Sequence, residues 1–340
     1  AGLGVFIGAA LFVALAAVII LFLKSPTIQG NIYRIRTTVL IVASFCMVML
    51  FTKIALNAQA ISDNFANLAT AYDKYGFVYC FSNSVVDVGI SEPSDYSEEK
   101  MLEIKDELDT VKASGAKFAK RKPNVIVVQL ESFMDPSYVK ELSFNMNPIP
   151  NFTKLKEECS SGFLTMPAIG AGTANSEFEV LSGFDVAYFG AGEYPYKTVL
   201  GSTTCETMAT QFKKLGYSTH AMHNHDGTFY DRYIVYKNLG FDTFTPMEYM
   251  YDVEHTQKNW EKDNVLTGEI MKTLKSTEDR DFIFTVSVQG HGRYPDEKVL
   301  ENPAVSVTRA DSDEQKWSYE YYINQVYEMD LFVKELTDAL

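Results

Sequence analysis

The chain has 340 residues, with 44 acidic and 30 basic side chains, and its formal charge is −14. An apolar share of 46% is enough for a large buried core and excludes a disordered or collagen-like chain. The negative charge excludes a general nucleic-acid binder, because the phosphate backbone would be repelled. Residues 1–62 contain no Asp or Glu and only four of the basic residues, so 44 acidic residues face 26 basic ones in the remainder. An acid-free apolar part followed by an acidic part indicates a membrane protein.

Two apolar segments predict transmembrane helices within a first domain, residues 1–56. Leu3–Leu23 is an unbroken run of apolar and small residues, long enough to cross a hydrocarbon core. Thr37–Leu56 is interrupted only by Lys53, whose side chain can extend to the interface. The alternative for this second segment is a buried core helix. The loop between the segments carries three bases and no acid, which predicts that it is cytoplasmic. We therefore expect a multi-pass protein of the cell membrane whose remaining chain is extracellular.

Residues 57–122 are interpreted as a linker region that contains a charged helical stretch at Ser97–Lys112. From residue 123 to residue 340, strand patterns alternate with helix patterns. Strands are predicted at 124–130, 217–222 and 282–288, and helices at 176–182, 203–215, 229–239, 264–274 and 311–340. This alternation predicts an α/β fold in which a mainly parallel sheet is sandwiched by helices.

Polar clusters follow the predicted strands, where parallel sheets bind their ligands. Glu131-Ser132 follows the first strand, and the segment 223–226 (His-Asn-His-Asp) follows the second. The segment 289–292 (Gln-Gly-His-Gly) follows the third. A glycine-rich loop, 169–176, leads into a helix and contains Thr173. We expect these four clusters to converge on one rim of the sheet.

Each cluster has a functional and a structural interpretation. Glu131 is a candidate ligand for a hard metal such as Mg²⁺ or Mn²⁺, or a carboxylate at a helix start. Thr173 is a candidate nucleophile, or the N-cap of the helix that follows. Arg232 suits paired hydrogen bonds to phosphate, or is a solvated side chain on a surface helix. His291 is a candidate general acid, metal ligand or phosphate donor, or a loop histidine without a role.

Three of the five histidines lie at proposed strand ends, which favours a functional site there. His220 and His255 are assigned structural roles. Trp260 and Trp317 are interpreted as packing residues rather than as a platform for a sugar ring.

Several motifs resemble the lipoteichoic acid synthase family, which are membrane-anchored phosphoglycerol transferases of the sulfatase and alkaline phosphatase superfamily. The motifs are Asn124 to Ser132, Pro150 to Thr153 and Gly172 to Glu179. Segments 223–232 and 289–295, and the region of Asp263, fit the same family in order and spacing. The resemblance covers residues 123–340, which it implies are a sulfatase-like catalytic domain.

The resemblance implies a divalent metal, Mn²⁺ or Mg²⁺, bound by Glu131 and Thr173. It also implies that Thr173 is the catalytic nucleophile, which carries glycerol-phosphate covalently. The family completes its metal site with an Asp-His pair on a later strand, and no such pair precedes Leu340. We therefore expect a C-terminally incomplete fragment that is inactive by itself.

The resemblance further implies that Arg232, His291 and His223 bind the glycerol-phosphate group, with Tyr230 where the family usually has Trp. The implied reaction transfers glycerol-phosphate from phosphatidylglycerol to a glycolipid or polymer acceptor of the cell envelope, as in lipoteichoic acid synthesis. One alternative is a phosphoethanolamine transferase or a sulfatase-like hydrolase on the same fold. Another is an inactive membrane-anchored binding or sensor domain.

Overall fold

The computed structural model describes residues 20, 24, 34–63, 65, 67–86, 89–90, 92–93, 95–113, 122–168, 172–278 and 280–340. The chain divides into two compact units, residues 1–62 and residues 63–340. The first predicted membrane segment, Leu3–Leu23, lies almost entirely outside the described residues.

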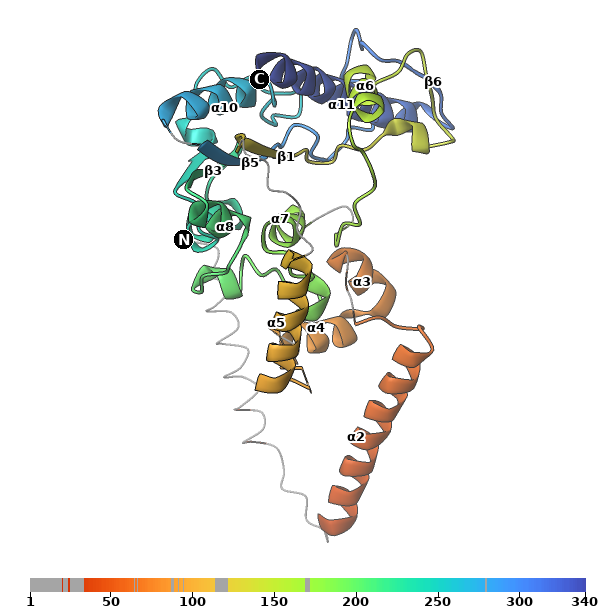
Figure 1. Ribbon diagram of the computed structural model, residues 1–340. Helices are drawn as coiled ribbons and strands as arrows, with labels where there is room; N and C mark the ends of the chain where they lie inside the picture. The colour runs from red at the N-terminus through yellow and green to blue at the C-terminus, as the bar shows by residue number, and fades with distance from the viewer. Residues whose placement is uncertain are drawn as a thin grey trace. The chain divides into compact units, whose positions relative to one another are not determined.

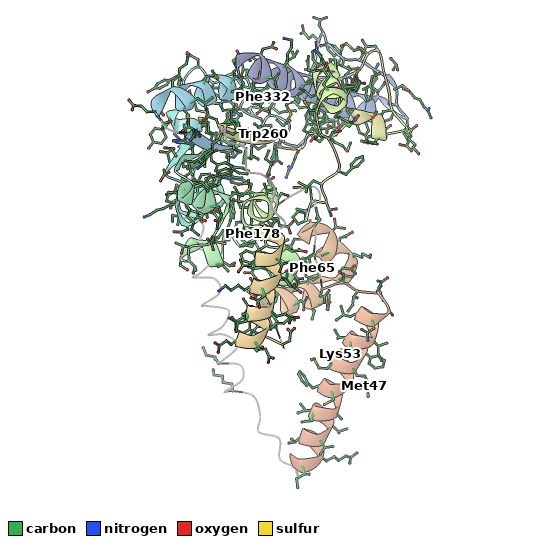
Figure 2. All side chains as sticks on the ribbon, in the orientation of Figure 1. Met47, Lys53, Phe65, Phe178, Trp260 and Phe332 are labelled. Atoms are coloured by element: carbon green, nitrogen blue, oxygen red, sulfur yellow. The ribbon has the colours of Figure 1, made fainter. Side chains whose placement is uncertain are left out.

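The first unit contains helix α2, Arg34–Asn57, which covers the second predicted membrane segment. Its 24 residues extend over about 36 Å, enough to cross a hydrocarbon core of about 30 Å. In the described part of the chain, α2 alone is long and apolar enough to span a membrane, and its most apolar window is not buried. This is not the burial expected of a core helix. Met47 and Lys53 project from α2 in Figure 2.

The second unit is built around a four-stranded sheet with the order β1-β5-β3-β4 (Figure 1). Its strands are β1 Val125–Gln129, β3 Tyr217–His223, β4 Thr243–Pro246 and β5 Arg280–Val286. All three pairings are parallel, which confirms the predicted α/β class with a mainly parallel sheet. The short strand β4 was missed because it has four residues and ends in a proline, which suits only a sheet edge.

Helices cover both faces of this sheet. They are α6 Pro150–Glu158, α7 Thr173–Ser182, α8 Met208–Lys214, α9 Arg232–Asn238, α10 Val265–Ser276 and α11 Asp313–Ala339. A small antiparallel pair joins β2, Ser143–Phe144, to β6, Val307–Arg309.

Alternation along β5 produces two separate cores, because successive side chains of a strand point to opposite faces. Phe282 and Phe284 pack into a core with apolar residues of α7, α8 and α9. Ile283, between them, packs into a second core with residues of α10 and α11. Phe178 and Phe332 mark these two cores in Figure 2. Each fully buried side chain of this size contributes about 1.5–3 kcal/mol to folding.

Two predicted helices begin later than expected. Thr207 caps α8 by accepting from the N–H groups of Ala209 and Thr210, so the helix begins at Met208 and not at residue 203. The helix predicted at 229–239 is broken by Tyr230 and Asp231, whose φ angles are 58° and 54°. The break lies within a short 3-10 turn, Phe229–Asp231, and α9 follows it.

The region interpreted as a linker contains three helices. These are α3 Leu68–Tyr75, α4 Phe77–Val86 and α5 Glu98–Ala113, of which only α5 was predicted. Residues of α3 and α4 form a small core with Ala191 of the main domain. The hydroxyl of Ser84 also donates to the Ala191 carbonyl at 3.1 Å. The aromatic residues of this region therefore pack against the loop that follows α7.

Candidate functional site

The centre of the site is a direct contact between two predicted residues, Thr173 and Glu131. Thr173 is the first residue of α7, after Gly172, whose φ is 93°. Its Oγ1 donates to Glu131 Oε2 at 2.6 Å. The helix has no side-chain N-cap bond, so the N-cap alternative for Thr173 is wrong. Glu131 lies in the turn after β1, so it does not start a helix. A hydroxyl is thus held at the positive end of a helix, where anions are favoured.

Glu131 is a partly buried carboxyl group. Burial raises its pKa, while the hydrogen bond from Thr173 and the charge of His291 act in the opposite direction. The charges of Glu177 and Arg232 also act on the pKa of Glu131, so these two groups lie close to it. A carboxylate that is desolvated in this way is stabilised by a nearby cation.

Gly290 brings the third strand-end cluster against Glu131. A Cβ atom at this position would lie 2.4 Å from the Glu131 carbonyl oxygen, so only glycine permits the approach. The Glu131 N–H also donates to Ser287 Oγ at 2.9 Å. These contacts fix the loop that carries His291 beside the Glu131–Thr173 pair.

Arg232 lies in a buried ion pair with Glu177. The two residues are 2% and 0% exposed. Arg232 Nε donates to Glu177 Oε2 at 3.2 Å, and Nη2 donates to the other oxygen. Tyr196 and Tyr236 donate to the same carboxylate. Burial opposes the charge of Arg232, but Glu177 outweighs it and raises the pKa of the guanidinium. The alternative of a solvated surface arginine is therefore wrong, and direct phosphate binding by Arg232 stays a prediction.

His223 is a buried neutral histidine at the end of β3. Its Nδ1 lies 3.0 Å from the Val286 carbonyl oxygen, which can only accept, so Nδ1 carries the proton. Burial, and then the charge of Arg232, lowers the pKa of His223 well below its ordinary value. The remaining nitrogen, Nε2, therefore has a free lone pair that suits a hydroxyl donor.

A continuous series of ring contacts runs through the strand-end loops. This aromatic series consists of Tyr194, Tyr230, Phe229, His225, Trp260 and His291. Its tightest contact joins Trp260 to His291, with ring centroids 4.2 Å apart. Tyr230 stacks on Tyr194 at 5.8 Å. The sequence interpretation assigned Trp260 to packing, but the structure places it in contact with a predicted site residue.

Asp263 ties three of the strand-end loops together. Its Oδ1 accepts from Asn224 Nδ2 at 2.9 Å and from the N–H groups of Val288 and Gln289 at 3.2 Å each. Asn224 follows His223, and Gln289 precedes the His291 loop. Burial raises the pKa of Asp263 to about 6. This carboxyl therefore sets the spacing between His223 and His291.

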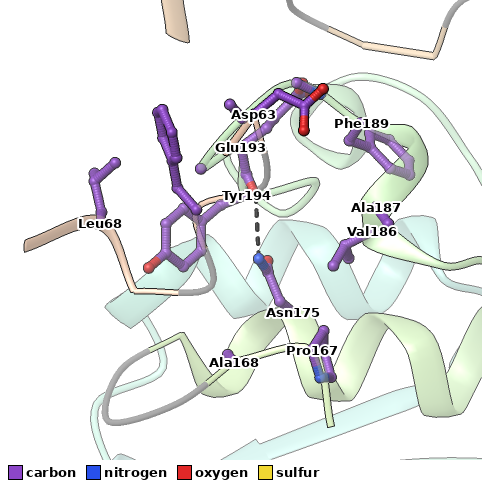
Figure 3. A pocket seen from close by; sticks show the side chains of 14 residues that line it. Asp63, Leu68, Pro167, Ala168, Asn175, Val186, Ala187, Phe189, Glu193 and Tyr194 are labelled. Atoms are coloured by element: carbon purple, nitrogen blue, oxygen red, sulfur yellow. Dashed lines mark hydrogen bonds between the residues drawn. The ribbon is translucent and has the colours of Figure 1, made fainter. Parts of the chain in front are cut away.

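A cavity of about 290 Å³ lies next to the amino end of α7. Figure 3 shows Asn175 projecting toward it, with its Nδ2 donating to the Glu193 carbonyl at 3.1 Å. Phe65 and Leu68 from the segment before the main domain contribute to the lining. The region of α3 thus contacts the same loop that surrounds the start of α7.

The oxygen atoms of Glu131 and Thr173 are the donor type that a hard divalent cation prefers. The partly buried Glu131 carboxyl, with its raised pKa, also fits a cation beside it. Within the described residues, no group of three or more His, Cys, Asp or Glu side chains is arranged to hold a metal. Glu131 and Thr173 therefore fit as part of a metal site, and the structure describes no further ligands.

All six predicted site residues lie in this one region, and their roles stay predictions. Reasoning from the sequence missed Glu177 as the partner of Arg232, and it missed the pairing of His225 with Glu261. The adjacent charged pattern at 261–263 is the signal that could have identified the second pair.

Comparisons with known proteins agree with this architecture. A protein of Rhizobium meliloti (strain 1021) named for cyclic beta-1,2-glucan modification is 31% identical over 231 residues, covering 68% of this chain and 35% of that protein. The capsular polysaccharide biosynthesis protein RkpI of the same organism is 25% identical over 225 residues, covering 64% of this chain and 38% of that protein. The chain thus spans little more than a third of the length of these curated relatives.

Among solved structures, Streptococcus pyogenes phosphoglycerol transferase GacH in complex with sn-glycerol-1-phosphate has a TM-score of 0.64 and 20% identity. The match covers 73% of this chain and 66% of that chain. Neither curated relative is named for lipoteichoic acid, so the narrower resemblance stays a prediction. The Sulfatase family profile matches residues 123–340. The chain therefore belongs to the sulfatase family, within the superfamily of sulfatases and alkaline phosphatases.

Proposed function

We propose that the protein transfers glycerol-phosphate from phosphatidylglycerol to a polysaccharide or glycolipid acceptor of the cell envelope. The observation that carries this proposal is the 2.6 Å hydrogen bond from Thr173 Oγ1 to Glu131 Oε2 at the start of α7. It places a hydroxyl nucleophile, a carboxylate and a helix N-terminus at one point, which is the arrangement that a transferred phosphoryl group requires.

In the first step, Thr173 Oγ1 attacks the phosphorus of phosphatidylglycerol. The new bond joins Oγ1 to phosphorus, and the bond to the diacylglycerol oxygen breaks. Glu131 takes the proton of Thr173, and His291, which is partly exposed and acts electrostatically on Glu131, protonates the leaving alcohol. In the second step, an acceptor hydroxyl gives its proton to His291 and attacks the phosphorus, the bond from phosphorus to Thr173 Oγ1 breaks, and Glu131 returns the proton to Oγ1.

The buried groups around this pair fix the charge of the site before the substrate arrives. Arg232 is held as a cation by Glu177, so its guanidinium keeps a fixed position. His223 is neutral and presents a free Nε2 that can accept a hydrogen bond from a glycerol hydroxyl. Such fixed dipoles and charges stabilise a phosphoryl transition state without reorganisation.

A divalent metal held by Glu131 and Thr173 would neutralise phosphate charge and favour the deprotonated hydroxyl. The comparisons favour a carbohydrate acceptor, since the two curated relatives are named for glucan modification and for capsular polysaccharide biosynthesis. The apolar helix α2 supports anchoring at a membrane, where phosphatidylglycerol is available.

The test is a Thr173→Ala variant of the full-length protein, assayed for diacylglycerol release from labelled phosphatidylglycerol. We expect a loss of at least about a thousandfold, because the bond-forming atom is removed. Thr337→Ala, which removes an exposed hydroxyl on α11, is the matched control and is expected to keep full activity. Normal diacylglycerol release by Thr173→Ala would contradict the proposal. Preferential use of phosphatidylethanolamine by the wild-type protein would instead identify a phosphoethanolamine transferase.

A further inference from the structure

The loop after β4 forms a hairpin that carries the partly exposed Trp260 and the buried Glu261. His255 and Glu261 form an antiparallel bridge, and Thr256 N–H donates to the Trp260 carbonyl at 2.7 Å. Asn259, at the tip, has a φ of 66°, which is the left-handed conformation that a tight turn needs. The backbone bonds and the tight turn therefore order the hairpin and fix the position of the Trp260 indole ring.

Three side chains of this region combine an aromatic surface with polar groups. The Trp260 ring lies 4.2 Å from the His291 ring and 5.4 Å from the His225 ring, measured between centroids. His225 Nδ1 in turn lies 3.0 Å from Glu261 Oε2. Trp260 remains partly exposed, and its neighbour in the aromatic series, Phe229, is 49% exposed. Large aromatic groups left accessible beside a site are a feature of ligand-binding surfaces.

This combination suits a neutral sugar ring. The face of a sugar carries C–H groups of partial positive charge, which pack against the negative face of an indole. Hydroxyl groups at the edge of the sugar can hydrogen-bond to an imidazole nitrogen of His225, which is partly exposed. The buried Glu261 carboxylate behind His225 disfavours a second phosphate at this position, because two anions would lie close together.

We propose that Trp260 and His225, whose imidazole is held in place by Glu261, form the binding site for a neutral sugar ring of the acceptor. This inference rests on the proposed transfer reaction and adds the acceptor's class to it. Trp260 contacts His291, and His291 acts electrostatically on Glu131. A sugar on Trp260 thus lies beside the reacting centre, with a hydroxyl available for the second step. The site selects an uncharged saccharide over a polymer of repeated phosphates.

The test measures saccharide binding separately from catalysis. A neutral β-1,2-linked glucan oligosaccharide is titrated by calorimetry into the full-length protein in detergent. We expect Trp260→Ala to weaken binding at least tenfold and Trp260→Phe to retain part of the affinity. Glu261→Gln is expected to weaken binding less than Trp260→Ala does. Tyr249→Ala removes a ring that is 70% exposed outside the aromatic series, and it is expected to bind as the wild type does.

A second measurement separates this inference from the proposed function. Trp260→Ala should lower transfer to the oligosaccharide at least tenfold more than it lowers phosphatidylglycerol turnover, through a raised KM for the acceptor. Thr173→Ala should lose turnover and still bind the oligosaccharide. Equal losses of transfer and turnover in Trp260→Ala, or unchanged oligosaccharide binding, would overturn the sugar site and leave Thr173 chemistry intact. Absent phosphatidylglycerol turnover in the wild type, with Trp260-dependent binding, would overturn the proposed reaction alone.

Discussion

Two histidine–carboxylate pairs lie at opposite ends of the sheet and differ in almost every other respect. At the amino ends of β4 and β5, His220 Nε2 lies 3.2 Å from Asp281, and its Nδ1 lies 2.7 Å from Thr243. At the carboxyl ends, His225 lies 3.0 Å from Glu261. The side chains of His220 and Asp281 are 7% and 1% exposed, whereas in the second pair only Glu261 is buried, at 6%, and His225 is 24% exposed.

The contrast shows how position decides what a histidine can do. Both ring nitrogens of His220 are occupied by partners on neighbouring strands, so this pair joins three strands and has no atom left for a ligand. Only one nitrogen of His225 has a side-chain partner, and the ring lies in a loop at the end where parallel sheets bind ligands. Stability and transfer measurements on single variants can therefore distinguish groups that stabilise the fold from groups that act on a ligand.

The largest expected effect comes from the ion pair beneath the functional end. Glu177→Ala leaves the Arg232 guanidinium buried and unpaired, which should lower the free energy of unfolding by about 3–5 kcal/mol. Urea unfolding measures this loss. Asp338→Ala, which removes the partner of Lys334 in an exposed pair, is the control and should change stability by less than about 1 kcal/mol. Equal stability of the two variants would show that the pair does not support the site.

The second prediction compares the two histidines directly. His220→Ala should lower the free energy of unfolding by about 2–3 kcal/mol, because it leaves Asp281 buried without its imidazole partner. His225→Ala also leaves a buried carboxylate, Glu261, without its imidazole partner, so it should lower the free energy of unfolding by about 1–3 kcal/mol, and it should in addition reduce transfer to the saccharide acceptor. Unfolding curves and transfer assays measure the free energy of unfolding and the rate of transfer for each variant. Loss of transfer without loss of stability in His220→Ala would reverse the assignment.

The last prediction concerns Asp263, which holds the strand-end loops together, and its effect appears only as the pH changes. Its folded-state pKa of about 6 exceeds the ordinary value of 3.8, so the folded protein retains this proton between those pH values. The stability that results is complete below about pH 4 and is lost as the pH rises through about 6. The two-unit shift corresponds to about 3 kcal/mol. Asp263→Asn keeps the accepting oxygen and should therefore gain up to that amount relative to the wild type between pH 4 and pH 7, measured by urea unfolding. A difference in the free energy of unfolding between the two proteins that does not change with pH would contradict this account.

The sequence was sufficient to predict the groups at the carboxyl ends of the strands. Glu131, His223 and His291 each follow a hydrophobic run, and parallel strands place such residues at one edge. Pairings between distant segments could not be predicted in the same way. Glu177 and Arg232 are separated by 55 residues, and their contact depends on how α7 and α9 pack on the same face.

The hairpin that carries Trp260 was also missed, for a local reason. It follows β4, a strand too short to show a periodic pattern, so no strand end was expected there. With β4 unrecognised, Trp260 had no position relative to the site, and packing was the natural interpretation. The structure supplies that position through ring contacts with His225 and His291.

The most direct test of the central claim is to detect the covalent intermediate on Thr173. The full-length protein is mixed with phosphatidylglycerol, quenched in acid within the first turnover, digested and analysed by mass spectrometry. We predict that the peptide containing Thr173 gains the mass of one glycerol-phosphoryl group, and that added acceptor removes this adduct. Rapid turnover of phosphatidylglycerol with no adduct on Thr173, or an adduct on another residue, would contradict the assignment of Thr173 as the nucleophile.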